Sequence, residues 1–181
     1  VGKPMYLSMV KLADDDGNEI SEPNTPGELL WGGPQTFSGY WNNPDETAKT
    51  LKDGWVHSGD MAVRDEDGYY YIVGRKKNMF ISGGENVFPP EIERAMYDIA
   101  EIHEVSVFGV PDEKWGEVGK AVVSLKPGKR VSKEEIVAAL GSKLARYKIP
   151  KYIAFVDEVP KNNVGKIVVS KVVELYGRAT D

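Results

Sequence analysis

The stretch GRKKNMFISGGENVFPPEIE, residues 74–93, marks the point at which the sequence pattern changes. It contains a cationic run at residues 75–77, an apolar run at 79–81, and then two adjacent glycines before a helix start. Paired glycines permit positive φ angles and let a ligand approach the backbone. On local grounds alone, a flexible linker followed by a tight turn explains the stretch more simply.

The segments before and after this stretch have different secondary-structure patterns. Residues 5–73 form short β-like runs separated by turn clusters such as RDEDG, in which Asp67 and Gly68 are typical of a hairpin turn. After Gly74, patterns typical of helices and strands alternate. We therefore predict an α+β chain with a boundary near residues 74–78, β-rich before it and mixed after it.

Three helices are expected in the second part. Residues 88–100 carry prolines in the first turn and place Ile92 and Met96 on one face. Residues 132–147 begin with a capping box from Ser132 to Glu135, and residues 170–177 end in a glycine. Strands are expected at residues 105–110, 121–125 and 152–160.

Composition narrows the functional classes. The 181 residues are 41% hydrophobic and 28% charged, which is enough for one sizeable core or two small ones. The net charge of -5 argues against a nucleic-acid partner, and no apolar run approaches the roughly 20 residues of a membrane span. With no cysteine and two histidines, a thiolate or histidine-rich metal site is not expected. A cytoplasmic location fits best, and carboxylates and lysines must carry any chemistry.

Four separated motifs change the interpretation of the central stretch. They are GELLWGGPQTFSGYWNNPDET (27–47), GWVHSGD (54–60), the 74–93 stretch and LARYKIPKYIAFVDEVPKNNVGK (144–166). Their order and approximate spacing are similar to the late core motifs of the adenylate-forming enzymes. This AMP-binding ligase superfamily includes acyl-CoA synthetases, nonribosomal peptide adenylation domains and luciferases. The chain resembles their C-terminal third, and most of all a fatty or related acyl-CoA synthetase.

The resemblance implies how the chain is divided. Residues 1–75 would be the distal β-rich part of the large adenylating domain, a β-barrel-like remnant. Residues 76–181 would be the mobile C-terminal domain, a small sheet flanked by helices. The family's phosphate loop and its adenine and Mg²⁺ motif would lie upstream of Val1, so this chain alone is expected to be inactive. The exposed strands of the first part could pair copies into a homo-oligomer.

The resemblance also implies nucleotide and CoA contacts. Asp60 and Arg75 would bind the ATP or AMP ribose, because a carboxylate accepts hydrogen bonds from two adjacent hydroxyls. In isolation, a turn or helix-cap aspartate is the simpler explanation of Asp60, and an exposed interdomain arginine is the simple explanation of Arg75. Lys77 falls at the hinge position, where the small domain rotates. Gly83 and Gly84 would line the CoA pantetheine tunnel, where a side chain would obstruct the thiol.

Lys166 is the candidate catalytic residue. A solvated lysine in a turn is the simple explanation of GK at this position. The resemblance implies instead that Lys166 contacts the carboxylate and phosphate oxygens during adenylation, holding them in line and neutralising charge. Tyr147, Lys148 and Pro150 match a motif of mainly structural role. Asn162 or Asn163 stands where many members have threonine.

The implied activity is that of an ATP-dependent acid:CoA ligase. Such an enzyme activates a carboxylic acid, here fatty acids above all, as an acyl-adenylate and transfers it to CoA, releasing AMP and pyrophosphate. ATP, CoA and Mg²⁺ are the implied cofactors, the Mg²⁺ held mainly by the upstream region. Two alternatives remain open: a noncatalytic binding or regulatory module with the same fold, and an adenylation domain that serves a carrier protein.

Overall fold

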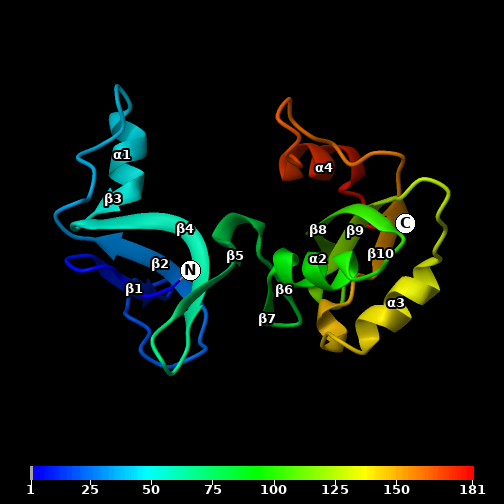
Figure 1. Ribbon diagram of the computed structural model, residues 1–181, viewed down its shortest axis with the longest axis horizontal. Helices are drawn as coiled ribbons and strands as arrows, with labels where there is room; N and C mark the ends of the chain where they lie inside the picture. Colours follow the sequence, from blue (N-terminus) through cyan, green and yellow to red (C-terminus); the bar gives the residue numbers. More distant parts are fainter. Residues whose placement is uncertain (1) are drawn as a thin grey trace. The chain divides into compact units, whose positions relative to one another are not determined.

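The computed structural model describes residues 2–181, which fold into two compact units (Figure 1). Unit 1 ends at Lys77, and unit 2 runs over Asn78–Asp181. Each unit contains its own β-sheet, and helices occur in both. The predicted α+β class is confirmed. The assignment of residues 1–75 and 76–181 to parts of a larger enzyme stays a prediction.

Unit 1 is built around one long strand. Its elements are β1 (Met9–Ala13), β2 (Gly27–Gly32), α1 (Pro44–Thr50), β3 (Leu51–Lys52), β4 (Trp55–Arg64) and β5 (Tyr70–Arg75). All pairings are antiparallel: β2 pairs with β4 along one edge, and β3 and β5 share the other edge. The hairpin expected at Asp67 and Gly68 joins β4 to β5, and Gly68 has the positive φ of +81° that this turn requires.

The sheet of unit 1 is irregular at its centre. Between the pairs Glu28–Met61 and Leu30–His57, β2 contributes Leu29 alone, whereas β4 contributes residues 58–60. The two extra residues form a bulge in β4. A bulge bends its strand and redirects the side chains that it carries.

Unit 2 is centred on the hairpin of β8 (Ile102–Asp112) and β9 (Gly116–Leu125). β10 (Tyr152–Phe155) lies parallel to β9 on its other edge. The small hairpin of β6 (Phe80–Ser82) and β7 (Glu85–Val87) joins β9 through the pair Ser82–Gly116. The expected strands 105–110 and 121–125 are therefore parts of two longer strands.

Alternation along β8 and β9 creates two apolar faces. The helices α2 (Pro89–Tyr97) and α3 (Lys133–Gly141) cover one face, and its buried core includes Ile92, Met96, Val105, Val107, Ala121, Val123, Ile136 and Leu140. The helix α4 (Val169–Tyr176), red in Figure 1, contributes Val172 to the core on the opposite face together with Phe108, Val110, Val118, Val122 and Val159.

The helix ends follow the sequence signals in part. The capping box of Ser132 and Glu135 is present, with both reciprocal hydrogen bonds. The helix that it starts ends at Gly141, earlier than the expected residue 147. A separate 3₁₀ turn follows at Arg146–Lys148. Leu144 still packs against the core, because its backbone N–H bonds to the carbonyl of Leu140 and holds the chain close to the helix.

Two polar side chains of α2 protect the outer edge of β8. The Val107 N–H donates to Glu93 Oε1 at 2.9 Å, and the Val105 N–H donates to the Tyr97 hydroxyl at 3.4 Å. An open strand edge would otherwise expose these amides to pairing with another chain. Burial raises the pKa of the Glu93 carboxyl above its usual value, although the Val107 N–H partly offsets this.

Replacing Glu93 with glutamine should stabilise unit 2. The difference in the free energy of unfolding between the variant and the unchanged chain should grow as pH rises. Because the folded pKa is raised, the stability associated with Glu93 is complete below the unfolded value and is lost as pH rises through the folded value. The side-chain carbonyl of a glutamine at this position would still accept from Val107 without burying a charge. We expect the free energy of unfolding of Glu93→Gln to exceed that of the unchanged chain by on the order of 1 kcal/mol at pH 7 and by less at pH 4.

Urea unfolding at the two pH values measures this difference. The exposed Glu134, on α3, provides the matched control through Glu134→Gln. A Glu93→Gln effect that is the same at both pH values would contradict the prediction.

Candidate functional site

Asp60 and Arg75 lie directly opposite each other on β4 and β5. Arg75 Nε donates to Asp60 Oδ1 at 2.8 Å, and Arg75 Nη1 donates to the carbonyl of Ser58 at 3.2 Å. The Asp60 side chain retains 28% of its exposure and that of Arg75 retains 55%, so a ligand has access to both. The structure thus brings together the two residues expected to bind the nucleotide ribose, and their role stays a prediction.

The bulge in β4 sets the position of Asp60. Ser58 Oγ donates to the Leu29 carbonyl at 2.6 Å and accepts from the Asp60 N–H at 3.0 Å. Gly59, between them, has a φ of +70°, which residues with a side chain rarely adopt. The sequence HSGD therefore forms a turn within the strand that directs the Asp60 carboxylate toward Arg75.

Glu28 connects this bulge to the end of unit 1. Its carboxylate accepts from the Gly59 N–H at 3.2 Å and from Lys76 Nζ at 3.1 Å, and His57 Nδ1 lies at 3.6 Å. Lys76 also pairs with Asp15 at 2.9 Å. Burial of Glu28 opposes its ionisation, but the Lys76 ammonium and the Gly59 N–H outweigh burial and lower its pKa.

Glu28 is not among the residues predicted from the sequence. The one sequence feature that could have indicated a role for Glu28 is an acidic residue inside the otherwise apolar strand GELLWG. Its partner Lys76 lies 48 residues away in the sequence, so the pair is not visible as a motif. A single acid in a strand is ordinarily a solvent-facing residue. The pairing appears only once the strands are assembled.

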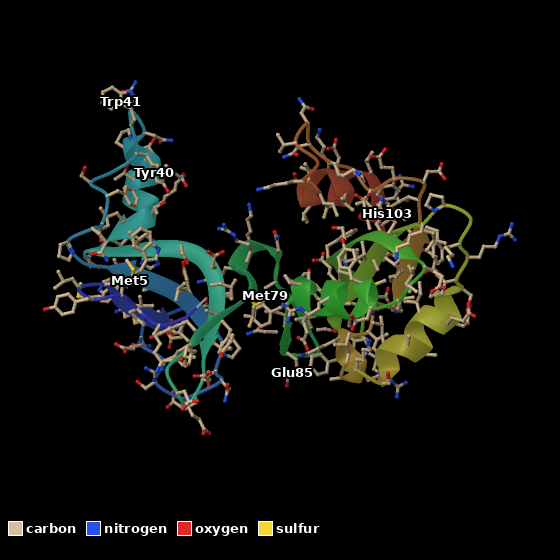
Figure 2. All side chains as sticks on the ribbon, viewed as in Figure 1. Met5, Tyr40, Trp41, Met79, Glu85 and His103 are labelled. Atoms are coloured by element: carbon tan, nitrogen blue, oxygen red, sulfur yellow. The ribbon has the colours of Figure 1, made fainter. Side chains whose placement is uncertain are left out.

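A shallow pocket of about 630 Å³ adjoins the Asp60–Arg75 pair. It runs from Arg75, Ser58 and Gly59 to the loop and helix around α1. Tyr40 lines it, whereas the neighbouring Trp41 is 96% exposed at the end of that loop (Figure 2). Its lining joins polar groups and aromatic rings: Glu28, Trp31, Phe37, Tyr40, Glu46, Lys49, His57, Ser58 and Arg75.

The residue expected at the hinge lies where the units divide. Lys77 occupies the 3₁₀ turn Lys76–Asn78, and unit 2 begins at Asn78. The preceding residue, Lys76, is fixed to unit 1 through Asp15 and Glu28. This location is compatible with a hinge, and the hinge role stays a prediction.

Gly83 and Gly84 form the turn between β6 and β7, with φ angles of +61° and +88°. The Gly83 N–H donates to the Trp115 carbonyl at 2.9 Å, and a Cβ on Gly83 would lie 2.8 Å from the Trp115 ring. A Cβ on Gly84 would meet no atom of residues 2–181 within 4 Å. The backbone at Gly84 is therefore open to a ligand.

A second pocket, of about 490 Å³, lies next to this turn. Aromatic rings and cationic side chains line it together: Ser82, Lys114, Trp115, Val118, Arg146, Tyr147, Ile149 and Lys151. Sequence reasoning missed it because its lining comes from three separate segments. Tyr147 thus lines a pocket, in addition to belonging to the motif that we expected to be structural. Lys148 of that motif has a structural contact, an ion pair with Glu91 at 2.8 Å.

Lys166 lies on a different loop of unit 2, between β10 and α4. Its side chain is exposed, and Gly165 before it has a φ of +80°. The Lys166 N–H donates to Asn162 Oδ1 at 2.9 Å, so asparagine supplies the turn hydrogen bond at this position. The catalytic role expected for Lys166 stays a prediction.

Within residues 2–181, no helix is long and apolar enough to cross a membrane. In the same part of the chain, no three histidine or acidic side chains are grouped so that they would hold a metal ion.

Replacing Glu28 with glutamine should loosen the β4 bulge. The substitution keeps the size of the side chain but removes the charge that Lys76 and the Gly59 N–H compensate. We expect the amide of Gly59 to exchange with solvent about tenfold faster, since a hydrogen bond to a charged group contributes more than a neutral one. The lowered pKa of Glu28 adds a pH dependence: its contribution to stability is present above the unfolded pKa and is lost as pH falls through the folded value.

Hydrogen exchange of the peptide that covers residues 57–60 measures this effect. Glu22→Gln, in an exposed loop of the same unit, is the matched control. Unchanged exchange in Glu28→Gln would show that the bulge does not depend on this carboxylate.

Comparison with known proteins gives the family context of these residues. Residues 91–166 match the AMP-binding enzyme C-terminal domain. The chain is 44% identical over 176 residues to a feruloyl-CoA synthase from Amycolatopsis sp, covering 97% of this chain and 36% of the relative. It is 43% identical over 174 residues to a long-chain-fatty-acid–CoA ligase from Bacillus subtilis (strain 168), covering 96% of this chain and 31% of the relative.

A solved structure gives the same result. The o-succinylbenzoate CoA synthetase (MenE) from Bacillus subtilis, in complex with the acyl-adenylate intermediate OSB-AMP, matches with a TM-score of 0.87 and 32% identity. The match covers 94% of this chain and 34% of that one. The chain spans about a third of the length of the relatives that it matches. These findings confirm the resemblance expected from the four motifs: the chain is similar, along nearly its whole length, to the C-terminal part of the adenylate-forming acyl- and aryl-CoA ligases.

Proposed function

We propose that this chain is the C-terminal part of an ATP-dependent acid:CoA ligase. The complete enzyme would convert a carboxylic acid, with fatty acids as the first substrates to test, into an acyl-adenylate and then into an acyl-CoA. The observation that carries the proposal is the similarity to CoA ligases along nearly the whole chain. The names of the relatives indicate different acids. The choice of fatty acids therefore rests on the resemblance of the sequence ISGGENVFPPEIE, residues 81–93, to fatty or related acyl-CoA synthetases.

In the first half-reaction, the acid's carboxylate would attack the α-phosphorus of ATP, and pyrophosphate would leave. Asp60 and Arg75 would hold the ribose, using the free oxygen of the carboxylate and the guanidinium face. Lys166, from its exposed hairpin, would contact the carboxylate and phosphate oxygens together. One ammonium that touches both reactants aligns them and neutralises the charge that develops between them.

In the second half-reaction, the CoA thiol would attack the acyl carbonyl, and AMP would leave. The open backbone at Gly84 suits the narrow pantetheine arm. The adjacent pocket combines the rings of Trp115 and Tyr147 with the cations of Arg146 and Lys151. Rings that stack on a base and cations that pair with phosphate are the groups that a nucleotide such as that of CoA requires.

The two half-reactions use different loops of unit 2. Lys166 would serve the first, and the Gly83–Gly84 turn would serve the second. A rotation at Lys77 would exchange them at one reaction centre, so that one site performs two reactions in turn. We expect the 181 residues alone not to adenylate any acid, because the acyl pocket and the phosphate loop would belong to the upstream region.

Replacing Lys166 with alanine in the full-length enzyme should slow adenylation by about a hundredfold or more, as does the loss of a group that stabilises transition-state charge. Pyrophosphate release with ATP, Mg²⁺ and a panel of fatty, aryl and dicarboxylic acids measures it. Lys129→Ala, an exposed lysine on another loop, is the matched control. The 181-residue chain alone should release no pyrophosphate.

Two results would overturn the proposal. A full-length enzyme that is inactive on every acid would favour a noncatalytic module with the same fold. Activity on an acid with transfer to a carrier protein but not to CoA would favour an adenylation domain instead.

Alanine at Gly83 or at Gly84 should slow thioester formation by about tenfold or more and leave adenylation within a few-fold. At Gly83 the new methyl group would displace Trp115, and at Gly84 it would occupy the open backbone face. The measurement is the rate of acyl-CoA formation from supplied acyl-adenylate. Gly128→Ala is the control for backbone strain, since Gly128 has a φ of +71° on a remote loop. An equal loss in both half-reactions would contradict the assignment.

A further inference from the structure

The loop that carries Lys166 is a short, closed hairpin. Lys161 and Ile167 form an antiparallel bridge at its base, and the Val168 N–H donates to the Pro160 carbonyl at 3.0 Å. The Asn162 N–H donates to the Lys166 carbonyl at 2.8 Å. The backbone position of Lys166 is therefore set by the base of the hairpin together with the turn.

Asn162 shapes the turn from inside. Its Oδ1 accepts from the backbone N–H groups of Val164 at 3.1 Å and Lys166 at 2.9 Å, and its carbonyl accepts from the Gly165 N–H at 2.9 Å. A side chain that accepts two backbone N–H groups makes a local turn rigid. The hairpin thus behaves as one piece, and its orientation depends on the contacts at its base, where Val159 and Ile167 pack in the core and Lys161 is the charged residue.

Lys161 fastens the base of the hairpin to the sheet. Its Nζ lies 2.9 Å from Glu104 Oε1 on β8 and 3.0 Å from Glu158 Oε1. The side chain of Glu104 is 16% exposed and that of Lys161 is 24% exposed, whereas Glu158 is 73% exposed. Of the two ion pairs, the one between Lys161 and Glu104 is therefore the more sheltered from water. It joins residues that are 57 positions apart in the sequence and so connects the hairpin to β8.

Glu104 depends strongly on Lys161. Its other oxygen, Oε2, is buried and has no hydrogen-bond partner within residues 2–181. Ser106 Oγ and Ser124 Oγ share this condition, and the pairing of Glu104 with Ser124 places the three on one face of the sheet. A carboxylate in such surroundings needs its cation, because removing the partner of a sheltered charge leaves it uncompensated. The ion pair therefore fixes Lys161 in place.

We propose that Lys161 and Glu104 are positioning residues for Lys166. Their ion pair orients the rigid hairpin 160–168 on β8, so that the Lys166 ammonium is presented in one direction during adenylation. The inference rests on the proposed function of Lys166. It assigns a role in the reaction to two residues that would not touch the substrates.

The test compares the two half-reactions in the full-length enzyme. The variants are Lys161→Ala, Glu104→Gln, the double variant, and Lys161→Arg, which keeps the charge. Lys129→Ala is the control. We expect each of the first three to slow adenylation by about tenfold, because a misplaced group loses its alignment. The double variant should be no slower than the single variants, and Lys161→Arg should restore part of the rate.

Thioester formation from supplied acyl-adenylate separates positioning from stability. It depends on the Gly83–Gly84 turn of the same unit and should stay within about twofold of the unchanged enzyme in every variant. A parallel loss of both half-reactions would assign Lys161 and Glu104 to the stability of unit 2 and overturn the inference. So would adenylation in Lys161→Ala at nearly the rate of the unchanged enzyme.

Hydrogen exchange on the 181-residue chain tests the inference apart from activity. The peptide that covers residues 161–168 should exchange about tenfold faster in Lys161→Ala, since the ion pair anchors the base of the hairpin, where the Asn162 and Val168 N–H groups are hydrogen-bonded. The β9 peptide, residues 116–125, should be unchanged. An unmodified full-length enzyme that is inactive would contradict the proposed function, whereas an unchanged 161–168 peptide would contradict the Lys161–Glu104 inference.

Discussion

Carboxylates removed from water need compensating groups, and this constraint shapes the part of each unit that carries the candidate functional residues. Glu28 lies within the central sheet of unit 1, where burial opposes its charge. The fold supplies the Lys76 ammonium and the Gly59 N–H at hydrogen-bonding distance. These partners belong to the β4 bulge and to the 3₁₀ turn that directly follows β5. Satisfying one buried charge therefore holds together the two places that carry Asp60 and Arg75.

In unit 2, buried charged groups likewise hold the loops that supply their partners. Lys161 compensates Glu104 and so holds the hairpin of Lys166. Lys120, which is 3% exposed, donates to the carbonyls of Arg178 at 2.9 Å and Thr180 at 2.6 Å. Burial lowers the pKa of Lys120. The ammonium satisfies its donors only if the C-terminal residues lie across the sheet, so the end of the chain is also held by a sheltered charge.

The fold was largely predictable from local signals, because those signals act over a few residues. The capping box at Ser132, the turn at Gly68 and the apolar face of α2 each express a periodicity or a torsion preference. The end of α3 at Gly141 was missed, since the apolar pattern continues to Leu144 beyond the helix. The apolar periodicity indicates which residues face the core but not whether they are helical. A turn that keeps Leu144 on the core side gives the same pattern as a longer helix.

The candidate site residues were predictable from a family resemblance and not from local physical signals. Asp60, Arg75, Lys77, the two glycines and Lys166 came from a resemblance, and their roles are still predictions. What the resemblance did not contain was the supporting structure. Glu28 with Lys76, Glu104 with Lys161, and the pocket around Trp115 each join segments that are distant in sequence. Their residue types are ordinary surface types, and only the paired sheets bring them together.

These supports have a consequence for the proposed rotation between half-reactions. Lys76 is tied to Asp15 and Glu28 in unit 1. On the other side, the Ile81 N–H donates to Glu117 Oε2 at 3.1 Å within unit 2. Residues 77–80 are thus the short segment between two anchored points, and Phe80 is already buried in the core of unit 2. A rotation of one unit against the other would have to be taken up by the torsions of residues 77–79. With so few torsions available, the chain would move between a small number of defined poses, which is what a site with two alternating reactions requires.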